Sequence, residues 1–263
     1  MRVMSFNANG IRAAARKGFF EWFLVQDIDV LCVQETKAQT EQLADAVFTP
    51  IGYHRFLFDA EKKGYSGVAI YTRQKPDQVV TGLGWPCPDT EGRYIQIDLG
   101  DLSIVSLYLP SGSSGDHRQA HKIEFMERYQ AILAEQLQTG RSWIICGDWN
   151  IVHREIDIKN FKSNQKTSGC LPEERAWLDD LFTSGWVDAF RVINQEPHQY
   201  TWWSNRGQAW ANNVGWRIDY QVISPDLKEK VKAVSIYREQ RFSDHAPLIV
   251  EYAPDGVIPK ANL

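Results

Sequence analysis

Four short polar segments of this 263-residue sequence directly follow apolar runs with the composition of β-strands, and a fifth precedes the last such run. The five segments are residues 7–10, 34–35, 110–112, 147–150 and 242–245. Loops at strand ends on a rigid scaffold are where catalytic and binding groups concentrate. Carboxylate and carboxamide oxygens are hard ligands, which Mg²⁺ binds together with water and substrate phosphate. The pattern predicts a Mg²⁺ site, with Mn²⁺ as a substitute, in which Glu35 is a direct ligand.

Each segment, taken alone, also has an ordinary structural explanation. Gly-Asp-x-Asn at residues 147–150 is the pattern of an Asx turn. Asp219 stands two residues after Arg217, so a surface ion pair would explain both. Asp244 and His245 are compatible with a hydrogen-bonded loop pair. The occurrence of several such segments in one chain, each beside a core strand, favours a shared site.

The histidines and cysteines argue against zinc. The six histidines form no His-Glu-x-x-His motif, and the four cysteines form no Cys-x-x-Cys pair, so we expect no tetrahedral Cys/His site. Cys32 and Cys146 lie inside apolar runs, as reduced core thiols do. Such cysteine usage indicates a reducing compartment. With no signal peptide and no stretch near the ~18 apolar residues of a membrane span, we predict a cytoplasmic protein that does not contact a membrane.

The elements that must position these side chains are mainly strands. Apolar, β-branched runs occur at residues 30–33, 68–71, 94–99, 102–109, 143–146, 218–223 and 248–252. Residues 94–99 alternate, which predicts one packed and one solvated face, whereas residues 143–146 are continuously apolar, which predicts a strand buried on both faces. Helical patterns occur at residues 16–25 and 120–138, and Pro172 opens a third helix. We predict two sheets packed face to face, with helices on the outer faces, in a single domain over residues 1–263.

Composition leaves the partner open. Hydrophobic residues make up 43% and charged residues 24%, as in ordinary soluble globular proteins. A formal net charge of −4 argues mildly against a nucleic-acid binder. A locally basic stretch between His153 and Arg175 argues the other way, although its acidic neighbours are also compatible with a solvated loop. A monomer is the default expectation.

Seven sequence blocks together resemble the exonuclease III-type abasic-site endonucleases. They are Phe6-Asn7-Ala8-Asn9-Gly10-Ile11-Arg12, Gln34-Glu35-Thr36-Lys37, Gly64-Tyr65-Ser66-Gly67-Val68-Ala69, Tyr108-Leu109-Pro110-Ser111-Gly112, Gly147-Asp148-Trp149-Asn150, Gly215-Trp216-Arg217-Ile218-Asp219-Tyr220 and Ser243-Asp244-His245-Ala246-Pro247. The blocks are collinear with that family from Arg2 to Tyr252, and as a set they are highly specific. The resemblance implies the four-layer α/β sandwich of the endonuclease/exonuclease/phosphatase superfamily. It also implies a base-excision-repair enzyme that incises double-stranded DNA 5′ to abasic sites, cleans blocked 3′ ends and degrades DNA from 3′ to 5′.

The resemblance also carries roles over to individual positions. For the metal, it implies Glu35 as a ligand, Asn7 as an ordering residue, and Asp244 in the outer shell or at an alternate metal position. For catalysis, it implies Asp148 as the group that activates water, Asn150 as its orienter, and His245, held by Asp219, as the contact to the phosphoryl oxygen. Tyr108 would donate to the phosphate. For substrate binding, it implies Trp202 and Trp216 around an extruded sugar, and Asn160, Asn164 and Arg206 on the DNA. Trp203 is expected in the core.

Three departures from the family pattern and two rival functions stay open. Asn9 stands where some members have Asp, Thr167 stands where Asn is common, and the loop that holds Arg206 varies, so the balance among the activities is open. Catabolite-repression control regulators share the fold and act in RNA-linked translational control. The presence of the complete carboxylate, Asn and His set favours an enzyme over that class. A phosphoesterase of lipid or inositol phosphates is the other rival, and the Trp-rich segment favours DNA over it.

Overall fold

The computed structural model describes residues 1–254 and contains two six-stranded sheets and a two-stranded ribbon. Sheet A has the order β13-β14-β1-β2-β4-β3, sheet B has the order β5-β6-β7-β8-β12-β9, and the ribbon is β10-β11. The strands of sheet A are β1 (Arg2–Asn7), β2 (Val30–Gln34), β3 (His54–Phe58), β4 (Val68–Thr72), β13 (Val231–Ile236) and β14 (Leu248–Tyr252). Those of sheet B are β5 (Gln78–Thr81), β6 (Tyr94–Leu99), β7 (Leu102–Tyr108), β8 (Ser142–Asp148), β9 (Val187–Asp188) and β12 (Asp219–Ile223). The ribbon consists of β10 (Trp202–Trp203) and β11 (Gly215–Trp216).

Both sheets are mixed. The pairs β1–β2 and β7–β8 are parallel, and the other neighbouring strands are antiparallel. The predicted buried strand extends from Ser142 to Asp148, with every residue after Ser142 buried. In β6 only Gln96 and Asp98 are partly exposed, as the alternation predicted.

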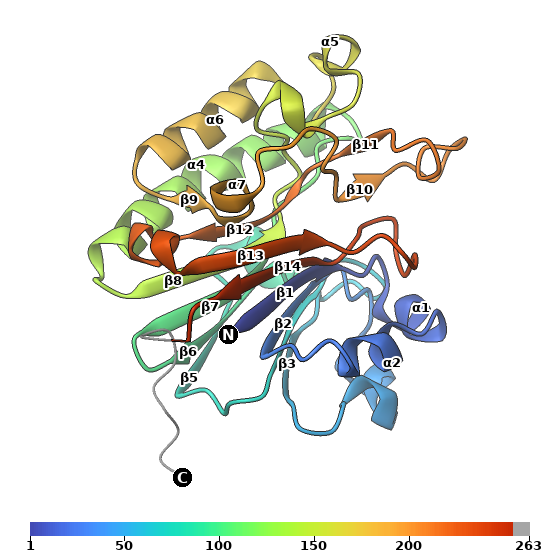
Figure 1. Cartoon of the computed structure of the whole chain (residues 1–263), viewed down its shortest axis with the longest axis vertical. Coiled ribbons are helices and arrows are strands. Elements are labelled where there is room, and N and C mark those ends of the chain that lie inside the picture. The colour runs from blue at the N-terminus through green and yellow to red at the C-terminus, as the bar shows by residue number, and fades with distance from the viewer. Residues whose placement is uncertain (255–263) are drawn as a thin grey trace.

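Helices cover the outer faces of the two sheets (Figure 1). The helices are α1 (Ile11–Arg16), α2 (Phe19–Leu24), α3 (Pro86–Thr90), α4 (Asp116–Gln138), α5 (Phe161–Asn164), α6 (Pro172–Thr183) and α7 (Ala189–Ile193), with 3₁₀ turns η1 (Thr40–Leu43), η2 (Ala46–Phe48), η3 (Glu155–Asp157) and η4 (Pro225–Lys230). The core of sheet A packs on α1 and α2, and that of sheet B packs on α4 and α6. A third core lies between the sheets. The predicted four-layer sandwich is confirmed.

The helix predicted for residues 16–25 is wrong in one respect. Gly18 adopts a left-handed conformation, with φ of 85°, and divides the segment into α1 and α2. Glycine adopts this conformation without steric cost, so the chain turns there and both helices can face sheet A. The predicted helix of residues 120–138 is present but begins earlier, at Asp116.

Polar side chains connect the two sheets within the shared core. Gln221 of β12 donates to the carbonyls of Val3 (2.9 Å) and Leu248 (3.4 Å) in sheet A. Gln34 of β2 donates to Ser106 Oγ of β7 at 3.0 Å, and Ser106 donates to the Val33 carbonyl at 2.9 Å. Because a buried polar group is costly unless it is paired, these bonds favour one alignment of the sheets over others.

Candidate active site

The parallel strand pairs bring the predicted residues to one end of the sandwich. Asn7 at the end of β1 lies opposite Gln34 at the end of β2, and Tyr108 at the end of β7 lies opposite Asp148 at the end of β8. The first residue of antiparallel β12, Asp219, also pairs with Asp148. Sheet A therefore supplies one part of the site and sheet B the other.

Asn7 joins the two carboxylates that the sequence singled out. Its Nδ2 donates to Glu35 Oε1 at 2.9 Å and to Asp148 Oδ2 at 2.8 Å. Asn7 is fully buried, so its amide cannot exchange these partners for water. Glu35 has a φ of 49°, a left-handed conformation that is uncommon outside glycine. Such an outlier is typical of a functional position.

Asp148 is held by an Asx turn as well as by the site. The backbone N–H of Asn150 donates to Asp148 Oδ1 at 2.9 Å, so residues 148–150 form the Asx turn that the pattern predicted, and the second oxygen, Oδ2, faces the site. The Asn150 side chain donates to the Leu109 carbonyl at 2.7 Å. A Cβ at Gly147 would lie 2.3 Å from the Leu107 carbonyl oxygen, so only glycine fits before the aspartate.

His245 forms a buried pair with Asp219. Its Nδ1 lies 2.8 Å from Asp219 Oδ2, and its Nε2 lies 3.7 Å from Asp148 Oδ2. Burial opposes a charged imidazole, but the charges of Asp219 and Asp148 outweigh it and raise the pKa of His245 above its usual range. The surface ion pair considered for Arg217 and Asp219 is wrong, because Arg217 is buried and pairs with Asp157 and Asp188 instead.

The donor atoms of this site fit a divalent cation. Ligand atoms of Glu35, Asp148 and His245 all lie within 4.8 Å of one another. Burial, together with repulsion from Asp219 and Glu35, raises the pKa of Asp148. A cation held between these carboxylates would offset that repulsion. Lys37, which the sequence-based site did not include, supplies part of the compensation with its Nζ 3.3 Å from Glu35 Oε2.

Asp244 lies outside the three-residue group. Its carboxylate accepts hydrogen bonds from Asn9 Nδ2 (3.0 Å) and Trp202 Nε1 (3.1 Å). Burial opposes its charge, but His245 and these donors outweigh burial and lower the pKa of Asp244. Asn9 therefore stabilises the ionised form of Asp244, which Asp at that position could not do by donation.

A cavity of about 260 Å³ opens onto these groups. Its lining combines the polar residues with two tryptophans: Glu35, Tyr108, Ser111, Ser113, Asp148, Asn150, Thr167, Ser168, Gly169, Trp202, Trp216, Ile218, Asp244 and His245. Ser111 and Ser113, from the Gly/Ser-rich segment after β7, thus contribute to the cavity. Gly169 leaves room for the Trp216 ring, since a Cβ there would meet it at 3.1 Å.

Arg93 and Lys122 are buried cations near the cavity that sequence reasoning missed. The Arg93 guanidinium lies 4.6 Å from the Tyr108 ring centroid and donates to the Tyr108 carbonyl at 3.1 Å. Lys122 Nζ donates to the Asn150 carbonyl at 2.8 Å and pairs with Glu174 at 2.7 Å. Neither belongs to a recognisable local motif, since the contacts to Tyr108, Asn150 and Glu174 join residues that are distant in the sequence. Both hold the backbone beside a predicted catalytic residue.

Three predicted substrate-binding residues do not line the cavity. Asn160 is exposed and borders a neighbouring hollow of about 540 Å³ with Lys159 and Lys162. Asn164 donates to the Asn160 carbonyl at 2.9 Å, and Arg206 is exposed in the loop between β10 and β11. They lie on surrounding surface, where only a long substrate would reach both them and the cavity.

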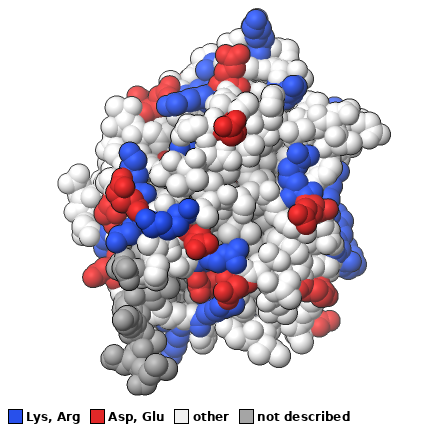
Figure 2. All heavy atoms as spheres, in the orientation of Figure 1, with Lys and Arg blue, Asp and Glu red and all other residues white. Residues whose placement is uncertain are grey.

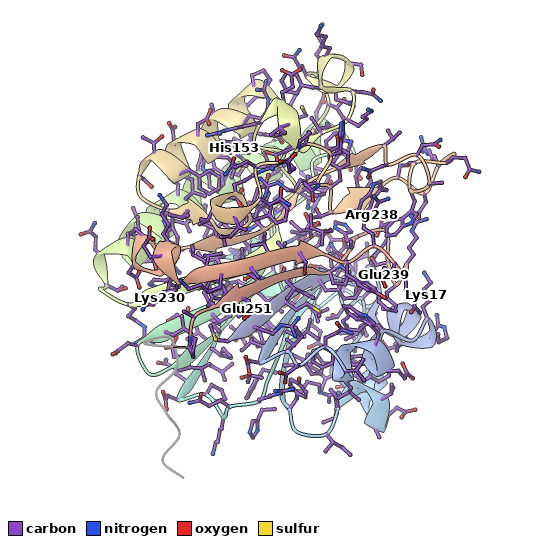
Figure 3. The ribbon with its side chains drawn as sticks, viewed as in Figure 1. Lys17, His153, Lys230, Arg238, Glu239 and Glu251 are labelled. Atoms are coloured by element: carbon purple, nitrogen blue, oxygen red, sulfur yellow. The ribbon has the colours of Figure 1, made fainter. Side chains whose placement is uncertain are left out.

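The charge around the site is mixed. Figure 2 shows both signs interspersed over one face of the molecule, in keeping with the net charge. Figure 3 shows Lys17, Arg238 and Glu239 at the edge where the loop after β13 reaches α1. Lys17 and Arg241 line a hollow of about 160 Å³ together with Asn9 and Asp244, so basic groups do adjoin the reaction centre.

All four cysteines are unpaired thiols. No helix within residues 1–254 combines the length and apolar character that crossing a membrane requires.

Comparison with known proteins agrees with this geometry. Residues 4–245 match the model of the Endonuclease/Exonuclease/phosphatase family. The chain is 37% identical to an exodeoxyribonuclease of Bacillus subtilis, over 94% of this chain and 98% of that protein. It is 36% identical to a DNA-(apurinic or apyrimidinic site) endonuclease of Dictyostelium discoideum, over 94% of this chain and 69% of that one.

Solved structures include an AP endonuclease from Archaeoglobus fulgidus, which superimposes with a TM-score of 0.86 at 26% identity, over 96% of this chain and 99% of that one. The predicted family, fold and enzyme class are confirmed. This chain belongs to the endonuclease/exonuclease/phosphatase family of nucleases.

Proposed function

We propose that the protein is a repair nuclease that hydrolyses phosphodiester bonds in double-stranded DNA, incising 5′ to abasic sites and processing 3′ ends. The observation that carries the proposal is the pair of hydrogen bonds from Asn7 to Glu35 and Asp148, which joins a cation-competent carboxylate to a buried base facing His245. The relatives named as exodeoxyribonuclease and abasic-site endonuclease support the same chemistry on DNA.

Glu35, together with Asp148, would hold Mg²⁺, or Mn²⁺ in its place. When bound, the cation supplies neutralisation of the charge that develops on the phosphoryl group. Asp148 accepts a proton from the attacking water, and Asn150 orients that water or the phosphate. Asp244, anchored by Asn9 and Trp202, contributes negative charge at the edge of the site rather than a direct ligand.

His245 and Tyr108 act on the phosphate. Asp219 accepts the Nδ1 proton of His245, which leaves Nε2 toward the reacting group. A raised pKa keeps the imidazole protonated at neutral pH, so Nε2–H can donate to a phosphoryl oxygen. Tyr108, whose pKa burial raises, remains a neutral phenol that donates beside it. Preorganised donors of this kind supply most of the rate in phosphoryl transfer.

The two tryptophans select the substrate. An enzyme that acts on an extruded nucleotide must offset the cost of unstacking, which is smallest where pairing is already lost. A narrow cavity walled by Trp202 and Trp216 accepts a baseless sugar and excludes a nucleotide with its base. Asn160, Asn164 and Arg206, outside the cavity, would contact the flanking DNA backbone. We further propose that the protein acts as a single-domain monomer in the cytoplasm.

A duplex with one central abasic analogue tests the function directly. With Mg²⁺ we expect a single incision 5′ to the analogue, no product in chelator, and no product from Asp148→Asn. A second duplex that carries a blocked 3′ end measures the end-processing activity. Wild-type protein that binds RNA and cleaves neither duplex with Mg²⁺ or Mn²⁺ would assign it to the regulator class instead.

A further inference from the structure

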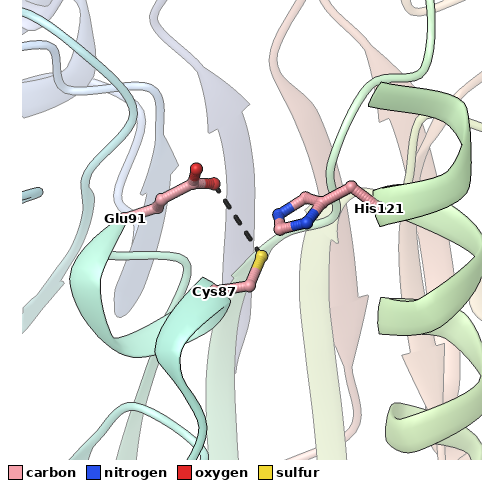
Figure 4. A group of neighbouring side chains, drawn as sticks. All are labelled: Cys87, Glu91 and His121. Atoms are coloured by element: carbon pink, nitrogen blue, oxygen red, sulfur yellow. Dashed lines mark hydrogen bonds between the residues drawn. The ribbon is translucent and has the colours of Figure 1, made fainter. Parts of the chain in front are cut away.

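Cys87, Glu91 and His121 form a second group of metal-competent side chains, away from the reaction centre. Cys87 belongs to α3, Glu91 follows that helix, and His121 faces them from α4 (Figure 4). One ligand atom from each residue lies within 4.8 Å of the other two, and Cys87 Sγ is 3.8 Å from Glu91 Oε2. The sequence contains no Cys-x-x-Cys pair and no His-Glu-x-x-His motif, so only the fold brings these three residues together.

The imidazole of His121 supplies an independent observation. Its Nε2 is buried and has no hydrogen-bond partner among the described residues. Buried polar atoms in proteins are nearly always paired, and an unmatched one calls for an ion, a water molecule or a functional role. Figure 4 shows the ring directed toward Cys87 and Glu91, so a ligand for this nitrogen would lie between the three side chains.

The chemistry of the three groups selects the metal. A thiolate and an imidazole are borderline or soft ligands, which favour Zn²⁺ over Mg²⁺. Zinc sites with three protein ligands and one water are well precedented. We propose that Cys87, Glu91 and His121 bind a Zn²⁺ ion, with water in the fourth position. On binding, the Cys87 thiol releases its proton to solvent and the Zn–S bond forms.

The positive charges of two arginines beside Glu91 repel a cation, which lowers the affinity of the site for Zn²⁺. Arg93 Nε lies 2.6 Å from Glu91 Oε2, and Arg118 lies 3.5 Å from Glu91 Oε1. A carboxylate has about four lone-pair positions, so Glu91 can bind the metal and keep these partners. Burial also raises the pKa of the Cys87 thiol to about 12, which adds the cost of deprotonation at neutral pH. We therefore expect weaker binding than at a site with four protein ligands.

Cobalt substitution tests the site, because Co²⁺ bound to a thiolate gives a sulfur-to-metal charge-transfer band that an oxygen-ligated ion at the reaction centre does not give. Titration of the wild-type protein with Co²⁺ should produce a saturable band that Zn²⁺ abolishes. Cys87→Ser should remove the band, and His121→Gln should weaken Co²⁺ binding by about tenfold or more.

Two variants serve as matched controls. His117→Gln changes an exposed histidine one turn earlier on α4, and Cys170→Ser removes a different thiol, so both should keep the band. Circular dichroism confirms that each variant is folded. Zinc should also protect Cys87 of the wild-type protein from alkylation, a measurement that needs no variant. Absence of the band at saturating Co²⁺, a band that survives Cys87→Ser, or alkylation unaffected by zinc would overturn the proposal.

Discussion

Trp202 and Trp216 are cross-strand partners in the β10–β11 ribbon, and their rings meet edge to face with centroids 5.8 Å apart and planes at 89°. The Trp202 indole also donates to Asp244 at 3.1 Å, while Trp216 packs over Gly169. The two rings therefore form a corner of fixed shape at the mouth of the reaction centre. Under the proposed function, this fixed corner would distinguish a small sugar from a complete nucleotide.

Trp216→Ala should slow incision of abasic duplex much more than it slows nicking of intact duplex. The Trp216 side chain lines the cavity but belongs to none of the groups proposed to act on the phosphate. The wild-type preference for abasic over intact duplex should be at least about a thousandfold, and the variant should narrow that ratio. Rates under single-turnover conditions on the two duplexes give the measurement. If the ratio is unchanged in the variant, the ribbon does not select the substrate.

Glu35→Ala should raise the Mg²⁺ concentration needed for half-maximal rate by about tenfold or more, because the variant removes a direct oxygen ligand. A titration of rate against Mg²⁺ measures this shift. Glu41→Ala, in the exposed η1 turn, is the control and should titrate as wild type. Retention of wild-type activity in excess chelator would contradict a metal-dependent reaction.

His245→Ala should reduce turnover by roughly a hundredfold or more, which corresponds to about 3 kcal/mol of lost transition-state stabilisation. Asp219→Asn should reduce turnover too, because Asn cannot stabilise the charged imidazole. Binding of abasic duplex should change far less in either variant, since the DNA contacts elsewhere survive. Equal losses in binding and turnover would mean that these residues only maintain the fold of the site.

Asp157→Asn should destabilise the protein and alter its acid response. Burial alone opposes the charge of Asp157, but Arg217 and Arg191 outweigh it and lower the pKa to about 2, against 3.8 for an ordinary Asp. A lowered folded-state pKa contributes stability above pH 3.8, and this is lost as the pH falls toward 2. The variant should lose about 3 kcal/mol at neutral pH, because it leaves buried arginine charge uncompensated.

Denaturant unfolding at several pH values measures both effects. The Asp157→Asn variant should also show a smaller further loss between pH 4 and pH 2 than the wild-type protein shows. Asp27→Asn is the matched control, since the Asp27–Arg73 pair lies at the surface and should contribute little. If the two substitutions lower the free energy of unfolding equally, the buried ion pairs of Asp157 with Arg191 and Arg217 contribute no more than a surface pair.

The strands and the reaction centre were predictable from the sequence for related reasons. A strand buried on both faces requires consecutive apolar residues. A polar residue directly after such a run must therefore lie where the strand ends. Glu35 and Asp148 could therefore be assigned to strand ends by local pattern alone. Glu35 directly follows β2 of sheet A and Asp148 ends β8 of sheet B, so the packing of the two sheets brings them together, and no local pattern encodes which strand ends meet.

Contacts between distant surfaces could not be predicted in this way. The Arg217 side chain pairs with Asp157 and Asp188 because η3 and β9 pack beside it, and no local spacing encodes that packing. The approach of His121 to Cys87 likewise depends on how α4 lies against α3. The turn at Gly18 was missed because the amphipathic aromatic stripe that indicated the helix begins only at Phe19, so it does not show where the helix starts, and the left-handed backbone of Gly18 marks the break.

The cross-sheet hydrogen bonds of Gln221 have a mechanical consequence for catalysis. Glu35 and Asn7 are attached to sheet A, whereas Asp148 and Asp219 are attached to sheet B. A slide of one sheet over the other would separate Asn7 from Asp148 while leaving each sheet intact. Gln221 resists that slide, because movement would leave its buried amide without the carbonyls of Val3 and Leu248. The alignment of Asn7 with Asp148 thus depends on Gln221, a side chain in the interior of the protein that no substrate contacts.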